Sequence, residues 1–247
     1  MTLLLMLACA GRRNPNGVEL PDIAPQDYPS FEQLVAAHEA FVGGDKATSD
    51  DFYMKQLISA PAQGLTGEIE IWTHQGKVYT RSFIQGMGES TSGWTGQYGW
   101  EIDPNQGPRL LTEEELGPIK LMGMGNLSMT ETYRDATVNG LKVFDDQACW
   151  QVTATPIAYD EPTKIFFLVN TGVNIGTSGK VPTPMGKIRQ QSVMRDWQVV
   201  DGIAMPAVTE TTMLTLLMVA TLDTFEQDPQ ELPDFKAPPG VQALLEE

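Results

Sequence analysis

The sequence predicts a mainly β protein of the α+β class, with about ten antiparallel strands and two helices. From residue 51 onward, apolar and polar residues alternate with the period of two that is typical of strands. The 23 glycines and 17 prolines separate these segments with turns. Strands and helices do not alternate regularly, which excludes a doubly wound α/β fold. The 247 residues suit one domain of ordinary size.

Composition limits the possible functions. The chain has 16 Lys and Arg residues against 32 Asp and Glu residues, a formal net charge of −16. A surface that neutralises phosphates is therefore excluded, and we expect no nucleic-acid partner. Two His and two Cys residues offer little for metal binding or nucleophilic catalysis. We expect no cofactor and no metal.

The N-terminal segment indicates where in the cell the protein is located. Residues 3–10 are apolar but too few to span the roughly 30 Å hydrocarbon core of a membrane. They resemble the end of a secretory signal peptide, and Met6 to Cys9 resembles a bacterial lipobox. Residues 1–9 are thus interpreted as a signal-peptide remnant with Cys9 as the lipid attachment site. An unprocessed apolar tail is the alternative.

A flexible tether is expected over residues 10–30, where four prolines lie among Asn, Gly and Asp. Ala10 follows the lipobox cysteine, in place of the Asp that signals inner-membrane retention in such lipoproteins. In a bacterium with two membranes this predicts an outer-membrane lipoprotein that faces the periplasm. The charge of −16 opposes attraction to anionic headgroups, so attachment would depend on Cys9.

The first helix is expected over residues 31–42, with Ser30 as its N-cap and two glycines after its end. His38 lies on its apolar stripe and is interpreted as a packing residue. A second helix follows Thr112, which forms a capping box with Glu115. Glu113, Glu114 and Glu115 therefore act in capping, and a mobile, sulfur-rich segment follows at residues 121–125.

Hairpins are expected at several turns. Residues 65–73 and 78–85 alternate around a turn that contains His74, and five glycines between residues 86 and 99 indicate bends rather than phosphate binding. Asn139-Gly140 predicts a hairpin between residues 129–138 and 141–144. Further strands are expected at 150–155, 164–170, 186–199, 203–213 and 214–226, before a proline-rich end at 229–239.

Catalytic arrangements are scarce. Cys149 lies in an apolar strand pattern and is interpreted as a small buried hydrophobe. Glu101 and Asp103, two residues apart on a strand, could share a face as paired carboxylates of a hydrolase. Asp103 precedes a proline and is a common turn initiator, so we expect a protein that is not an enzyme.

Several strands are apolar on both faces, including residues 164–169 and 213–220. The chain also contains 12 methionines, and methionine adapts to irregular apolar partners. Two interpretations remain open on the residues alone. The sheet could hold a lipid or an acyl chain on its concave side, or it could have a thick core with a second layer of cover.

Four motifs carry a resemblance over about residues 31–240. They are residues 61–70, residues 99–104 with 107–111, residues 196–206, and Phe235 to Pro239. Together they resemble the outer-membrane lipoprotein-sorting, LolA/LolB-like family. The resemblance implies a half-open antiparallel β-barrel of about eleven strands with a few covering helices, enclosing an apolar cavity for acyl chains.

The resemblance favours the first interpretation, in which a membrane-anchored periplasmic protein binds a lipid or lipoprotein acyl chain. We expect a monomer, and a cell-envelope scaffold module with a filled core is the alternative. The cavity or lid candidates are large apolar residues spread along the domain. They are Trp72, Phe83, Trp94, Trp100, Leu116, Met122, Met124, Phe167, Met194, Met213 and Leu216.

Overall fold

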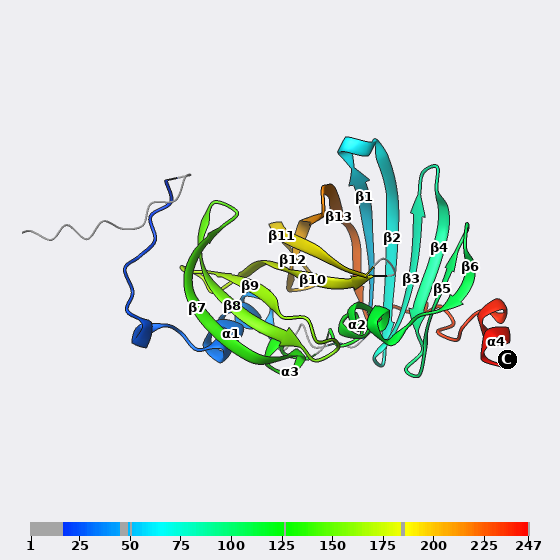
Figure 1. Cartoon of the computed structure of the whole chain (residues 1–247), viewed down its shortest axis with the longest axis horizontal. Helices are drawn as coiled ribbons and strands as arrows, with labels where there is room; N and C mark the ends of the chain where they lie inside the picture. Colours follow the sequence, from blue (N-terminus) through cyan, green and yellow to red (C-terminus); the bar gives the residue numbers. More distant parts are fainter. Residues whose placement is uncertain (1–16, 45–48, 50, 126, 184–185, 247) are drawn as a thin grey trace, which may run out of the picture.

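A computed structural model describes residues 17–44, 49, 51–125, 127–183 and 186–246 (Figure 1). Thirteen strands form one antiparallel sheet, in the order β6-β5-β4-β3-β2-β1-β13-β12-β11-β10-β9-β8-β7. The predicted fold class is confirmed, with thirteen strands in place of about eleven. Cys9, the lipobox and the first part of the predicted tether lie outside the described residues.

The elements follow the chain as a long meander. The strands are β1 (Phe52–Ala60), β2 (Leu65–His74), β3 (Lys77–Ile84), β4 (Gly88–Trp94), β5 (Gly99–Asp103), β6 (Gly107–Leu110), β7 (Tyr133–Phe144), β8 (Gln147–Pro156), β9 (Thr163–Leu168), β10 (Asn174–Thr183), β11 (Gly186–Val200), β12 (Ile203–Met213) and β13 (Leu216–Gln227). The helices are η1 (Pro25–Asp27), α1 (Phe31–Val42), η3 (Pro61–Gln63), α2 (Glu113–Met122), α3 (Met129–Thr132) and α4 (Pro239–Leu245).

The pairing of β1 with β13 unites two meanders, β1–β6 and β7–β13, into one sheet. Met54 lies opposite Phe225, and Ile58 lies opposite Ala220. A β-bulge between Lys55 and Gln56 shifts the register and bends the sheet there. The strands β6 and β7 are the two free edges.

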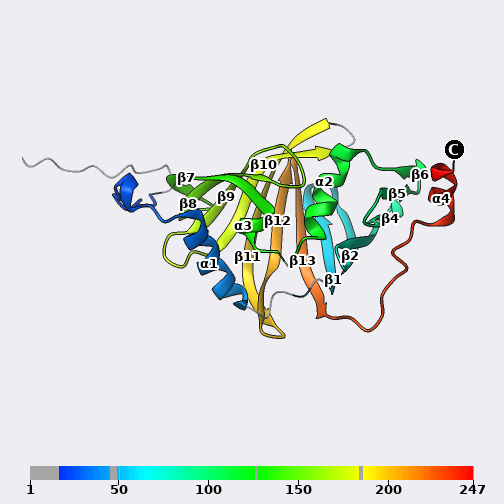
Figure 2. The ribbon, with the colours of Figure 1, turned by 90° about the horizontal axis from the view of Figure 1, so that it is seen from below.

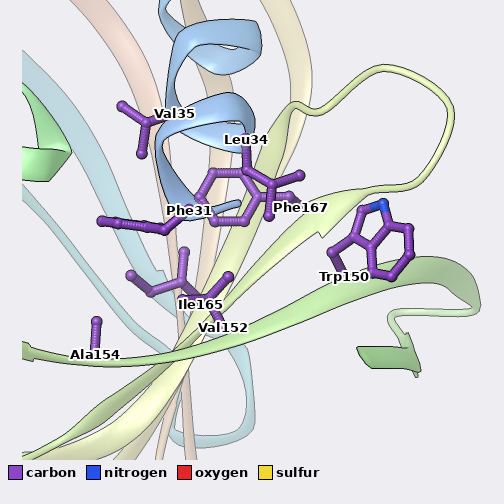
Figure 3. Packing of buried hydrophobic residues seen from close by; sticks show 8 residues of the cluster. All are labelled: Phe31, Leu34, Val35, Trp150, Val152, Ala154, Ile165 and Phe167. Atoms are coloured by element: carbon purple, nitrogen blue, oxygen red, sulfur yellow. The ribbon is translucent and has the colours of Figure 1, made fainter. Parts of the chain in front are cut away.

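Helices α1 and α2 pack on the same face of the sheet, which we name the inner face. Phe31, Leu34 and Val35 of α1 are buried against β8 and β9 (Figure 3). The predicted helix at residues 31–42 is confirmed, with a capping box between Ser30 and Gln33. The buried residues that α1 covers are Trp150, Val152, Ala154, Ile165 and Phe167.

Helix α2 begins with the predicted capping box. The Glu115 carboxylate accepts a hydrogen bond from the Thr112 amide at 2.8 Å and one from Arg109 Nη1 at 2.9 Å. Gly123 ends the helix against the β2–β3 turn, where a Cβ atom would lie 2.6 Å from the carbonyl oxygen of Gly76. Glu115 therefore serves in capping, as predicted, whereas Glu113 accepts a hydrogen bond from Lys120 Nζ at 3.0 Å.

The opposite, outer face is covered at both ends of the sheet. At one end, Trp100 is fully buried in a cluster with Ala237 and with Val241 of α4. At the other, Phe144 stacks on Phe166 with ring centroids 3.9 Å apart. Apolar residues on both faces of β9 are thus explained by this cover, whereas Leu217 of β13 is 38% exposed on the outer face.

The hairpin predicted at Asn139-Gly140 is wrong. Both residues lie inside the continuous strand β7, where the register shifts between Val138 and Gly140. Gly140 has a φ of 98°, and Asn139 Oδ1 accepts a hydrogen bond from Thr153 Oγ1 at 2.6 Å. The hairpin turns at Asp145-Asp146 instead, with φ of 50° and 55°. Asn-Gly signals positive φ, which a bulge needs as much as a turn.

Three elements were absent from the prediction. Strand β10 is rich in Gly and Ser, and β6 directly follows a turn, so neither shows an alternating apolar pattern. Helix α4 lies next to β6, after the proline-rich segment (Figure 1). Residues Met129–Thr132, expected at the start of a strand, form the short helix α3 with a capping box at Ser128.

We predict that His38 makes the stability depend on pH. Burial lowers its pKa from 6.5 to about 4, and its Nδ1 accepts a hydrogen bond from the Asn174 amide. The unfolded chain therefore binds the proton more tightly. The contribution of neutral His38 to the free energy of unfolding is complete above pH 6.5. About 3 kcal/mol of it is lost as the pH falls toward 4.

Urea unfolding at pH 7 and at pH 4.5 measures this contribution. His38→Gln keeps an acceptor but cannot be protonated in this range, so its loss of unfolding free energy on acidification should be smaller than that of the wild type by about 2 kcal/mol. Equal losses in the two proteins would contradict the prediction.

Candidate functional site

The register divides the predicted cavity residues between the two faces of the sheet. Trp94 lies opposite Val78 on the inner face, with Lys120 Nζ of α2 4.8 Å from its ring centroid. Trp72 lies opposite Tyr79, in the row that leads to buried Trp100 on the outer face. The inner-face candidates are Trp94, Phe167, Met194, Met213 and Leu216. The outer-face candidates are Trp72, Phe83 and Trp100. The other three belong to α2 and the residues after it, and they are Leu116, Met122 and Met124.

Some candidates are already packed within the protein. Trp100 and Phe167 have no exposed surface, and Leu116 is 3% exposed. Leu116 fills the space above Gly99, where a Cβ atom would lie 2.0 Å from its Cδ2. Phe83 is 46% exposed, on the outer face. These four side chains serve the cores or the outer surface. The remaining inner-face candidates, Trp94, Met194, Met213 and Leu216, therefore define the candidate site.

A methionine strip runs across the inner face of four adjacent strands. Met213 of β12 lies opposite Leu216 of β13, and Met218 of β13 lies opposite Thr211. Met194 of β11 lies opposite Thr209 of β12, which is itself opposite Ala220 of β13. None of these side chains is fully buried. The strip consists of Met54, Met194, Met213, Leu216 and Met218, of which the sequence reasoning missed Met54 and Met218.

The two helices flank this strip. Helix α2 contacts β3 and β4 on one side and β10 on the other, so it bridges the two meanders, whereas α1 contacts β7 and β12. Strands β11, β12 and β13 lie between the two helices in the view of Figure 2. Beyond α2, Ser128 Oγ donates a 2.6 Å hydrogen bond to Glu39 of α1. The predicted sulfur-rich segment therefore lies between the two helices, with Met122 and Met124 partly exposed.

Hydroxyl groups line part of the inner face on β3 and β4. Thr80 and Ser92 share a hydrogen bond of 2.6 Å between β3 and β4, and Ser82 and Ser90 share one of 2.7 Å. These side chains satisfy one another, so the surface has polar atoms without buried, unpaired groups. Alternating Ser and Thr in two adjacent strands was the sequence signal for this feature. The inner face is therefore apolar along the strip and hydroxyl-lined beside it.

The carboxylate pair has structural partners. Glu101 Oε2 accepts a hydrogen bond from Arg109 Nε at 2.8 Å, and Asp103 Oδ1 accepts bonds from the amides of Asn105 and Gln106 in the turn. Within the described parts of the chain, no group of three or more His, Cys, Asp or Glu residues could hold a metal ion. No helix among these residues is both long and apolar enough to cross a membrane.

Among the comparisons with known proteins, those with solved structures agree on the fold. No family model matches the chain, and no curated protein does. A LolA superfamily protein from Nitrosomonas europaea has a similar structure, with a TM-score of 0.58 and 12% identity over 84% of this chain and 96% of that one. A domain assigned to an outer membrane lipoprotein-sorting protein, from Vibrio parahaemolyticus, has a TM-score of 0.53 and 12% identity over 87% and 99%.

A DUF1329 family protein from Desulfovibrio piger is also similar, with a TM-score of 0.53 and 14% identity over 81% of this chain and 95% of that chain. The chain thus has a LolA-like fold, as the sequence motifs implied. At these identities the similarity shows the fold alone.

We predict that Cys149 is unreactive in the folded protein. It has no exposed surface in β8, and burial raises the pKa of its thiol to about 12, so almost no thiolate exists at pH 8. In a Cys9→Ser variant, which has no other thiol, a thiol reagent at pH 8 should modify Cys149 only after denaturant unfolds the chain. Equal rates with and without denaturant would be the contrary result.

Proposed function

We propose that this protein binds an acyl chain of a lipid or a lipoprotein along the methionine strip of its inner face. The observation that carries the proposal is that Met54, Met194, Met213, Leu216 and Met218 remain partly exposed between two covering helices. Elsewhere on the same face, the side chains under α1 are fully buried. A core built only for stability would bury the strip as well.

The chemistry of the strip suits this ligand. Each CH₂ group that leaves water contributes roughly 0.8 kcal/mol, so eight methylenes give useful affinity before the cost of ordering. Methionine side chains are flexible and polarizable, and they adapt to chains of different length. The hydroxyl groups of β3 and β4 add polar partners for the head of a ligand. The LolA-like fold supports this proposal.

The N-terminus supplies the proposed location. Acylation of Cys9 would anchor the protein to the periplasmic side of the outer membrane, with residues 10–30 as a tether. Such a protein resembles the receptor end of a lipoprotein-sorting system more than a soluble carrier. The domain carries out binding without a cofactor and without catalysis.

Two neighbouring leucines test the ligand site. Leu216 belongs to the strip, whereas Leu217 lies on the other face of the same strand and is 38% exposed. We predict that Leu216→Trp weakens uptake of a fluorescent fatty acid by delipidated protein about tenfold, because the larger side chain occupies the strip. Leu217→Trp adds the same volume outside the site and should leave the Kd unchanged. Absence of uptake by the wild type would refute the proposal.

The anchor is tested separately by fractionating cells. Cys9→Ser should move the protein from the membrane fraction to the soluble periplasmic fraction, because a single apolar segment of this length cannot span the bilayer. Cys149→Ala keeps the lipobox and should remain with the membrane. Retention of the Cys9→Ser protein in the membrane fraction would show that another feature binds the membrane.

A further inference from the structure

A hollow of about 710 Å³ lies on the outer face, on the side of the sheet opposite the methionine strip. Its floor is formed by β1, β2 and β3, and its other wall by residues 229–233 after β13. We name residues 228–238 the C-terminal strap. The hollow uses none of the residues assigned to acyl-chain binding, so it is a separate feature of the molecule.

Three aromatic rings from adjacent strands form the floor. Tyr53 and Trp72 are opposite each other, with ring centroids 4.9 Å apart and an angle of 33° between the rings. Tyr79 packs on the other side of Trp72 at 5.7 Å and 65°. Trp72 lies against the Tyr53 ring, and Tyr53 also lines the hollow. Glu226 of β13 lies directly opposite Tyr53 there.

The charges around the rings are mainly negative. Arg81 is the one cation that lines the hollow, and it is already paired, since its Nε donates to Glu70 Oε2 at 2.6 Å. Tyr53 Oη donates to the same carboxylate at 2.9 Å. Glu226 and Glu231 line the hollow and make no ion pair with any residue that the structure describes. The hollow thus has an excess of negative charge beside an aromatic ring face.

The strap is held at both ends. Asp228 accepts a hydrogen bond from Ser49 Oγ at 2.8 Å, and its amide donates to the carbonyl oxygen of Asp51 at 2.9 Å. Phe235 lies against His74 at a centroid distance of 5.8 Å, and Ala237 is buried under Trp100. Between these attachments, Pro229 to Pro233 cover the hollow without filling it. The wall of the hollow is therefore preformed.

We propose that this hollow binds an organic ammonium cation, held between the Tyr53 ring face and the carboxylates of Glu226 and Glu231. Aromatic faces attract ammonium groups through the ring quadrupole, and a nearby carboxylate adds Coulombic attraction. An anion would meet two carboxylates without a cationic partner among the described residues, and an apolar chain would offer them no attraction. The net charge of −16 also raises the local concentration of cations.

Tetramethylammonium is the probe, titrated into the full-length protein and followed by calorimetry. Glu226→Gln is expected to weaken binding about fivefold to tenfold, and Tyr53→Leu by a similar factor. Tyr53→Phe keeps the ring and should bind like the wild type, which separates the ring face from the bond to Glu70. Circular dichroism and thermal unfolding show that each variant is folded.

Asp22→Asn is the matched control for charge, because Asp22 is exposed and lies outside the hollow. It should leave the affinity unchanged. Equal affinity of Glu226→Gln and the wild type, or no binding of tetramethylammonium to the wild type at tens of millimolar, would overturn the proposal. These results do not depend on fatty-acid uptake, which is measured at the other face.

The source of the cation is distinguished with vesicles. If the ammonium group belongs to a lipid, the Cys9→Ser protein, which carries no lipid anchor, should sediment with phosphatidylcholine vesicles. Free tetramethylammonium should release it, and Glu226→Gln in the same background should sediment less. If the ligand is a soluble cation, tetramethylammonium should bind in calorimetry without any effect on sedimentation. Both results support the ammonium site and assign its source.

Discussion

The structure depends on one long-range pairing, that of β1 with β13. It joins residues near the start of the domain to residues near its end, as in the pair Ile58 and Ala220, and unites two meanders in one sheet. Closing so long a loop costs entropy, which the shared burial along both strands must offset. Both proposed sites lie across this pairing. It brings Met54 beside Phe225 on the inner face and places Tyr53 opposite Glu226 on the outer face.

Burial on the two faces is distributed unevenly, and this distribution leaves room for a ligand. The cores lie at the ends of the sheet, under α1 on the inner face and under α4 and the β7–β8 turn on the outer face. These cores supply stability, since a fully buried large side chain contributes about 1.5–3 kcal/mol. The middle of the inner face then carries the methionine strip with only partial cover. The stabilising cores and the proposed binding site thereby occupy different parts of one sheet.

Electrostatics organise the molecule locally despite the net charge of −16. Arg109 of β6 joins β5 through Glu101 and the start of α2 through Glu115. Arg195 joins β11 to the β7–β8 turn through Asp145. The few cations are thus used where two elements must be held together. Glu226 and Glu231 line the aromatic hollow and have no ion pair among the described residues, and this arrangement motivates the ammonium site.

The sequence by itself determined the features that depend on neighbouring residues. The N-cap at Ser30, the capping box at Thr112 and the β2–β3 hairpin need only local geometry. The hairpin turn predicted at Asn139-Gly140 was wrong because a positive φ occurs in a bulge as well as in a turn. Period-two patterns could not tell which face Trp72 or Trp94 would share with distant strands. Only the tertiary structure decided this, because a face is defined by which strands pair and by the bulges that shift their register.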